Sequence, residues 1–222
     1  LMLPTIATGN VASATAGGFS VANSCRFNDD DSAYISKTPA SDGNRKTWTF
    51  SAWVKRGGLG EGRILSTWIT AETKDGTIHL YPDGELLVVD YNGSGYITNL
   101  KTNRLFRDTS AWYHIVVASD TTQAVAANRV KIYVNGVQET SFATETYPAQ
   151  DTDWTGINED VAFVIGRKGN ADTQYFDGYL AEVVFIDGLA LAPTSFGEFD
   201  EDSPTIWKPI NVSGLTFGTN GF

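Results

Sequence analysis

The stretch NRVKIYVNGVQET, residues 128–140, contains the two signals that decide the fold of this chain. In VKIYV, branched apolar residues alternate with Lys131 and Tyr133, and this period of two indicates a strand with one buried face. The following pair, Asn135-Gly136, tolerates the positive φ angles that a two-residue hairpin turn requires. The stretch therefore predicts an antiparallel hairpin with Lys131 and Tyr133 outward and Val130, Ile132 and Val134 against a second sheet.

The same two signals recur along most of the chain. Short β-branched and aromatic runs occupy residues 47–56, 63–70, 77–81, 85–91, 111–119, 161–166 and 179–187. Further turn pairs lie between or beside them, namely Asp75-Gly76, Asp83-Gly84, Asn92-Gly93 and Asp187-Gly188. No stretch keeps a helical period, apart from a single turn after Pro193. This pattern predicts an all-β protein whose two antiparallel sheets pack as a jelly-roll sandwich.

Composition argues against several classes of partner. The chain has 222 residues, a formal net charge of −10, and 16 Lys and Arg against 26 Asp and Glu. A nucleic-acid-binding surface needs a basic face, so we expect no nucleic acid as a partner. No apolar run approaches the roughly 18 residues of a membrane span, so we expect no membrane insertion. Cys25 is the single cysteine and cannot form an intramolecular disulfide.

The chain divides into three parts. Residues 1–22 are small and uncharged, and such a segment buries little surface by itself. We expect a flexible or partner-docking arm there, a β-sandwich over residues 23–208, and a separate C-terminal segment over 209–222. No basic residue precedes Arg26, so the N-terminus does not match a secretory signal peptide.

Four segments, residues 44–56, 110–124, 128–138 and 175–191, resemble the laminin G-like domains of the concanavalin A-like lectin/glucanase superfamily. In that family a Trp-x-His strand precedes a strand that ends in Val-Asn-Gly, and a Phe-x-Gly strand closes the sheet. Here Trp112 and His114, then Val134-Asn135-Gly136, then Phe176 and Gly178 follow in that order. The resemblance covers roughly residues 24–207 and implies a two-sheet jelly roll that recognises glycans or proteins, with His114 as a framework residue.

The variants SAWYHIVVASDTTQA (110–124) and FIDGLALAPTSFGEFD (185–200) resemble domains in tail and other virion proteins of tailed bacteriophages, especially marine ones. In those relatives the chain continues past a sequence such as GTNGF, so we expect a further region after Phe222. The resemblance implies a virion protein made in the host cytoplasm. Its expected partners are a host-surface glycan or neighbouring virion subunits, and it could form a trimer. Host recognition and purely structural assembly are the two alternatives.

The superfamily also contains glycosidases, which carry Glu-x-Asp-x-x-Glu on one strand so that alternate carboxylates project into a cleft. The nearest stretch here is EFDED at residues 198–202. It follows Gly197, precedes Pro204 and lacks alternating apolar residues, so we expect a solvated acidic loop. The two histidines, His79 and His114, lie far apart in the sequence, which argues against a triad or a zinc cluster. We therefore expect no enzymatic activity, with a glycosidase as the weaker alternative.

Glycan binding requires aromatic rings beside hydrogen-bonding groups. Alternation in TWTFSAWVKR, residues 47–56, places Trp48 on the buried face and Thr49, Ser51, Trp53 and Lys55 on the outward face. The candidate glycan-binding residues are Trp53, Tyr133, Thr49 and Lys55 on a sheet face, and Tyr96 and Trp154 at loops. The alternative for each aromatic ring is packing under a loop or against another chain. Trp48 and Trp112 are assigned to the core or the framework.

Calcium is a possible cofactor, because laminin G-like domains often hold one calcium ion at the rim of the sandwich. The candidate ligands are Asp29, Asp30, Asp31 and Asp120, which lie in loops of the oxygen-rich kind that calcium prefers. Acidic loops that only increase solubility are the alternative.

Overall fold

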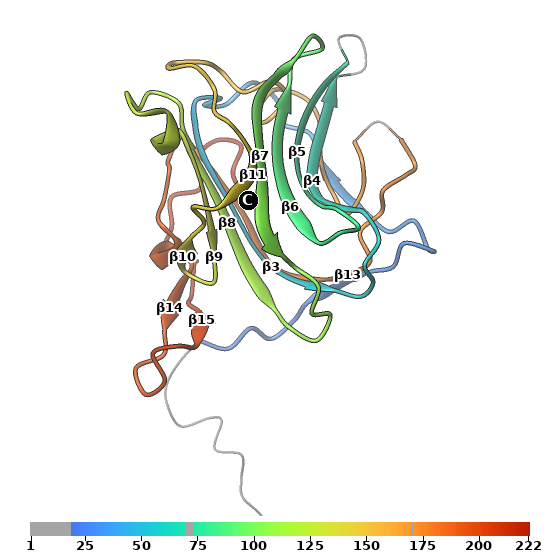
Figure 1. Cartoon of the computed structure of the whole chain (residues 1–222), viewed down its shortest axis with the longest axis vertical. Coiled ribbons are helices and arrows are strands. Elements are labelled where there is room, and N and C mark those ends of the chain that lie inside the picture. Colours follow the sequence, from blue (N-terminus) through green and yellow to red (C-terminus); the bar gives the residue numbers. More distant parts are fainter. Residues whose placement is uncertain (1–18, 70–72, 170) are drawn as a thin grey trace, which may run out of the picture.

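The computed structural model describes residues 19–69, 73–169 and 171–222. In this part of the chain, two antiparallel sheets pack face to face (Figure 1). The helical elements described are two 3-10 turns, η2 (Ala126–Asn128) and η3 (Pro193–Ser195), and no described helix is long and apolar enough to cross a membrane. The predicted all-β sandwich is confirmed.

The first sheet has six strands, in the order β1 (Cys25–Phe27), β13 (Gly178–Asp187), β3 (Thr47–Arg56), β8 (Tyr113–Asp120), β9 (Val130–Val134) and β10 (Val137–Gln138). The second has seven, in the order β11 (Phe142–Thr146), β7 (Tyr96–Leu105), β6 (Glu85–Tyr91), β5 (Lys74–Leu80), β4 (Gly62–Ile69), β12 (Phe163–Ile165) and β2 (Ile35–Lys37). A separate hairpin joins β14 (Gly197–Phe199) to β15 (Trp207–Pro209). Every predicted run corresponds to a strand, whereas six strands have no counterpart among the predicted runs: β1, β2, β7, β11, β14 and β15.

The core lies between the two sheets, and alternation along each strand decides which residues enter it. On β3, Trp48, Phe50, Ala52 and Val54 are fully buried, as predicted. Each large apolar side chain buried in this way contributes ~1.5–3 kcal/mol to stability. Trp154 lies edge-on to Trp48, with ring centroids 4.9 Å apart.

The predicted hairpin at Asn135-Gly136 is also confirmed. β9 and β10 are antiparallel neighbours, with Val134 opposite Val137. Asn135 and Gly136 have φ angles of 49° and 79°, the left-handed values that this turn requires. A Cβ atom on Gly136 would lie 2.4 Å from the ring of Trp207, so glycine also makes room for the C-terminal hairpin.

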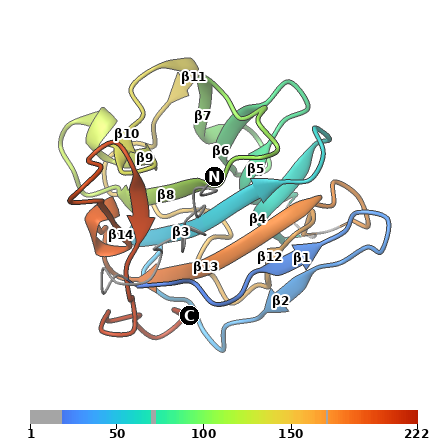
Figure 2. The same ribbon diagram turned by 90° about the horizontal axis from the view of Figure 1, so that it is seen from below.

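The C-terminal part of the chain covers one end of the outer face of the six-stranded sheet (Figure 2). Phe196 is buried there against Val116, Val184 and Ile186, and the partly buried residues Leu191, Val212, Leu215 and Phe217 pack around this cluster. At the end of the chain, the backbones of Phe222 and Phe185 exchange two hydrogen bonds, of 2.9 and 3.1 Å. The boundary expected at residue 208 is therefore not a break in the packing.

Candidate functional site

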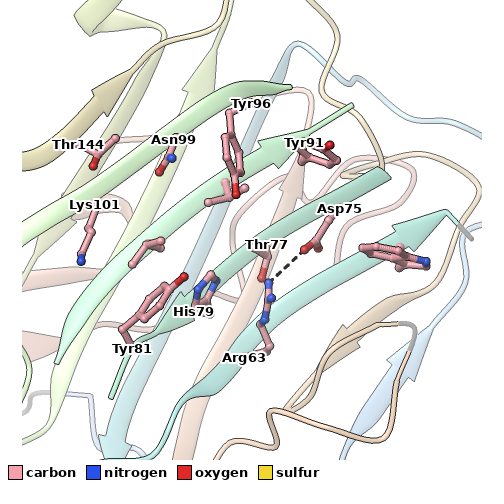
Figure 3. Close-up of a pocket in the computed structure, with 13 residues that line it drawn as sticks. Arg63, Asp75, Thr77, His79, Tyr81, Tyr91, Tyr96, Asn99, Lys101 and Thr144 are labelled. Carbon is pink, nitrogen blue, oxygen red and sulfur yellow. Dashed lines mark hydrogen bonds and ion pairs between the residues drawn. The ribbon is translucent and has the colours of Figure 1, made fainter. Parts of the chain in front are cut away.

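The outer face of the seven-stranded sheet carries a hollow of about 350 Å³ (Figure 3). This volume lies near the lower end of the range for ligand sites, roughly 300–1,000 Å³. Strands β4, β5, β6, β7 and β11 and the residues beside them supply its lining: Arg63, Trp68, Asp75, Thr77, His79, Tyr81, Leu87, Val89, Tyr91, Tyr96, Asn99, Lys101 and Thr144.

A ladder of polar side chains on β5 forms the floor of the hollow. In DGTIHLY, residues 75–81, Ile78 and Leu80 belong to the core, so the alternate residues Asp75, Thr77 and His79 point to the outer face. Tyr81 continues the ladder just beyond the strand, as Figure 3 shows. Period-two alternation thus places a carboxylate, a hydroxyl and an imidazole in one row.

Ion pairs and burial set the electrostatics of the floor. Arg63 Nη1 lies 3.3 Å from Asp75 Oδ2 (Figure 3), and Arg63 Nε donates a hydrogen bond to Gln174 Oε1 at 3.0 Å. Burial raises the pKa of the Asp75 carboxyl, and the charges of Arg63 and Lys168 partly offset that rise. At the other end of the hollow, Lys101 Nζ lies 2.9 Å from Glu85 Oε1.

His79 is neutral in this setting. Burial lowers its pKa well below the ordinary value, and the charges of Arg63 and Lys168 lower it further. The nearest acid is Glu61, whose Oε1 lies 3.9 Å from His79 Nε2, beyond hydrogen-bond range. Since a neutral imidazole has one donor and one acceptor nitrogen, His79 can give one hydrogen bond to a ligand and accept another.

Tyrosine rings surround this polar floor. Tyr96 is 59% exposed and meets Tyr91 edge-on, with ring centroids 5.2 Å apart. The Tyr81 ring lies 5.0 Å from that of His79, and the ammonium group of Lys101 lies 5.4 Å from the Tyr81 centroid. Exposed ring faces next to hydrogen-bonding groups are the combination that binds a sugar, because the C–H face of the sugar stacks while its hydroxyls pair.

Several buried polar atoms of the lining lack a hydrogen-bond partner among the residues that the structure describes. They are Asp75 Oδ1, Asn99 Oδ1, Trp68 Nε1 and both ring nitrogens of His79. A buried polar group without a partner costs about 1–3 kcal/mol, and unpaired groups of this kind call for an explanation. A ligand rich in hydroxyl groups can supply both donors and acceptors, so the hollow has the chemistry of a polyol site.

Of the predicted glycan-binding residues, the structure places Tyr96 in this hollow and the others elsewhere. Trp53, Tyr133, Thr49 and Lys55 share the outer face of the six-stranded sheet. There the Thr49 hydroxyl donates to the Leu189 carbonyl at 2.7 Å and accepts from the Leu191 amide at 2.8 Å. Thr49 is fully buried by these contacts, so its expected accessibility is wrong.

The burial of Trp154 and of Trp112 is the reverse of that predicted. Trp154 is buried and its Nε1 donates to Ser119 Oγ at 2.7 Å, so its expected accessibility at a loop is wrong. Trp112, assigned to the core or framework, is 36% exposed. With Trp53, Ala181, Pro209 and residues 21–24 it lines a second cleft of about 330 Å³ on the six-stranded sheet.

His114 is buried beneath this second face, as the framework assignment predicts. Its ring has two indole neighbours, Trp53 and Trp207, at centroid distances of 4.9 and 5.9 Å. Trp207 Nε1 donates to His114 Nδ1 at 2.9 Å, so the proton of the neutral ring is on Nε2, which lies 2.9 Å from Ser51 Oγ. Burial lowers the pKa of His114 to about 4.

The calcium candidates do not assemble into a site. Asp29, Asp30 and Asp31 lie in one exposed turn, where Asp31 accepts a hydrogen bond from Asn28. Asp120 accepts hydrogen bonds from its own neighbours, Thr122 and Gln123. Over residues 19–69, 73–169 and 171–222, no group of three or more His, Cys, Asp or Glu side chains could hold a metal ion.

The acidic stretch at residues 198–202 belongs to the C-terminal hairpin. Glu198 and Asp200 both approach Lys208 Nζ, at 3.4 and 3.3 Å. Among the described residues that line the hollow, Asp75 is the only acid. A glycosidase needs a pair of carboxyl groups across the scissile bond, and Asp75 is the one carboxyl group that the described lining supplies.

Asp75, His79, Asn99 and Lys101 have no counterpart among the sequence-derived candidates. The signal for the first two is present in DGTIHLY, where polar residues alternate with apolar ones as on any half-buried strand. The signal for Asn99 and Lys101 is weak, because YITNLKTNRL, the sequence of β7, buries threonines in place of branched apolar residues.

Comparison with known proteins agrees with this architecture. Residues 28–194 match the family model described as the concanavalin A-like lectin/glucanases superfamily. No curated protein matches the chain significantly.

Several solved structures are similar to this chain. A heptameric SAP-like pentraxin of Limulus polyphemus is 16% identical, with 79% of this chain and 76% of that chain covered and a TM-score of 0.52. Domains LG4-5 of the mouse laminin alpha1 chain are 15% identical, with 92% and 50% covered and a TM-score of 0.53. Tailspike protein 2 of Escherichia coli O157:H7 bacteriophage CAB120 is 10% identical, with 79% and 24% covered and a TM-score of 0.50.

These likenesses show the shared fold alone, and the chain spans only half of the laminin fragment and about a quarter of the tailspike chain. The family model, in contrast, matches well over half of this chain. The chain therefore belongs to the laminin G-type branch of the concanavalin A-like lectin/glucanases superfamily.

Proposed function

We propose that this domain is a non-catalytic glycan-binding module and that it binds through the hollow on the seven-stranded sheet. One observation carries the proposal: the exposed ring of Tyr96 lies at the same hollow as buried polar atoms of Asp75, His79 and Asn99 that have no partner among the described residues. Stacking on the ring and hydrogen bonding to the floor together recognise a sugar.

A glycan array followed by calorimetry tests this proposal. Tyr96→Ala should weaken binding of the best glycan by about 1–3 kcal/mol, the loss typical of a well-packed contact residue, while the far-ultraviolet dichroism spectrum stays unchanged. The matched control is Trp112→Ala, which removes an exposed aromatic ring from the opposite sheet face. If Trp112→Ala abolishes binding and Tyr96→Ala does not, the site is the second cleft.

The domain should not hydrolyse the glycan that it binds. Among the described residues, Asp75 is the single acid of the lining, with no second carboxyl group there to act as its partner. Incubation of the bound glycan with the protein should release no reducing ends. Turnover that disappears in Asp75→Asn would instead establish an enzyme.

We also propose that the module acts in the virion of a tailed bacteriophage and recognises a host-surface glycan. The support is the resemblance of residues 110–124 and 185–200 to phage tail domains. The likeness to a phage tailspike protein is compatible with this role. Labelled protein should bind intact host cells, and excess soluble glycan should compete. If instead the protein forms a defined trimer that binds neither cells nor glycans, structural assembly is the better explanation.

A further inference from the structure

We infer that the hollow selects an uncharged glycan that points hydroxyl donors at the floor. This inference rests on the proposed glycan-binding function and adds the chemical class of the ligand. Its basis is the balance of charge around the hollow, together with the kind of polar atom that lacks a partner there.

The two cations that line the hollow are already matched by carboxylates. Arg63 Nη1 lies 3.3 Å from Asp75 Oδ2, and Lys101 Nζ lies 2.9 Å from Glu85 Oε1. Hydrogen bonding from Lys101 lowers the pKa of Glu85, so this pair is fully charged at neutral pH. An acidic sugar would have to compete with Asp75 and Glu85 for these cations.

Among the described residues, the two further charges near the floor, those of Lys168 and Glu61, are of opposite sign. Lys168 Nζ lies 5.3 Å from the centroid of Trp68, and its charge lowers the pKa of Asp75. The carboxylate of Glu61 lies 3.9 Å from His79. Because His79 is neutral, it adds no charge to the balance.

The unpaired acceptors of the floor require donors from the ligand. Asp75 Oδ1 and Asn99 Oδ1 are buried acceptors without a partner among the described residues. A hydroxyl group can donate to either oxygen, whereas a carboxylate or sulfate has no proton to donate and would repel the charge of Asp75. The net charge of −10 also disfavours the approach of a polyanion.

The test compares neutral and acidic glycans of related backbone on one array. The probes include agarose and carrageenan oligosaccharides, galactan and polygalacturonate, and dextran and dextran sulfate, together with bacterial surface polysaccharides of both kinds. The strongest ligands should be neutral. Their affinity should change less than about twofold between about 0.05 and 0.5 M NaCl, because screening acts on charged partners.

Two variants examine the floor itself. Asp75→Asn should weaken binding of the neutral ligand several-fold. It should also reduce the discrimination against the acidic counterpart of that ligand, because it removes the charge that repels an acidic group. If Asp75→Asn does not fold, Asn99→Ala, which removes the side-chain amide and with it the unpaired acceptor, should weaken binding of the neutral ligand roughly tenfold. Glu198→Gln, in the hairpin outside the hollow, is the control and should leave affinity unchanged.

The outcomes separate this inference from the proposed function. Tight, salt-sensitive binding of acidic glycans, or equal affinity for the two members of a pair, would overturn the inference and leave the glycan-binding function standing. If no glycan of either class binds, the proposed function itself fails.

Discussion

Acidification should destabilise this domain through one buried histidine, His114. Its Nδ1 accepts the Trp207 indole hydrogen and its Nε2 faces Ser51 Oγ, so a second proton on the ring would place two donors against each other at Nδ1. The rings of Trp53 and Trp207 are its neighbours. Burial is the single cause of its lowered pKa, and no charged neighbour contributes.

The size of the effect follows from the two pKa values of His114. In the unfolded chain the imidazole has its ordinary pKa of 6.5, and in the folded domain the pKa is about 4. Because the unfolded chain binds the proton more tightly, this contribution to stability is fully present above pH 6.5 and is lost as the pH falls toward 4. Between about pH 7.5 and 4.5 the loss is about 2.5 kcal/mol, which corresponds to roughly 5–10 °C in Tm for a domain of this size.

Urea unfolding of the wild type and of His114→Gln at both pH values measures this contribution. Other groups titrate as well, so the informative quantity is the change with pH in the stability difference between the two proteins. That difference should shift by about 2.5 kcal/mol in favour of the variant at the lower pH. A difference that stays constant from pH 7.5 to 4.5 would refute the neutral, hydrogen-bonded state assigned to His114. His79→Gln, measured in the same way, gives the corresponding change with pH for the other buried histidine.

Three further predictions concern stability. Trp154→Ala should lower the free energy of unfolding by about 3–5 kcal/mol in urea titrations, because it empties a fully buried ring position beside Trp48; a loss below about 1 kcal/mol would contradict that packing. Gly136→Ala should destabilise through both its φ of 79° and its contact with Trp207, whereas Gly60→Ala, with no atom within 4 Å, should be nearly neutral by the same measurement. Burial raises the pKa of Asp90 to about 8. The contribution of Asp90 to folding stability is therefore present below pH 3.8 and declines as the pH rises toward 8. Thermal melts of Asp90→Asn should lack the part of the stability loss with rising pH that Asp90 causes.

The sequence predicts much of the fold because the dominant signals are local. Alternation in TWTFSAWVKR identifies both the strand β3 and its buried face, and Asn135-Gly136 marks a turn at the correct position. Strand β7 is not predicted because its inward positions include Thr98 and Thr102. Both are fully buried, but as polar residues they do not contribute to an alternating apolar pattern.

The site is harder to predict because alternation assigns a side to each residue but does not say what covers that side. Thr49 and Trp53 do point outward from β3, yet residues that follow β13, far away in the sequence, lie over part of that face. The opposite sheet carries the hollow on its outer face, and there Tyr96 lines the same hollow as the polar side chains of β5. Which of two sheet faces is open is a property of tertiary packing.

The six-stranded sheet is completed and covered by late parts of the chain, and this determines when the domain can fold during its synthesis. Strand β3 ends at residue 56, but its neighbour β13 begins at residue 178 and the indole that caps His114 is at residue 207. A nascent chain that stops short of these residues exposes β3 as an unpaired edge and leaves Val116 without cover, features that favour aggregation. On the ribosome, the sandwich should therefore close late, after the residues up to Trp207 have been made.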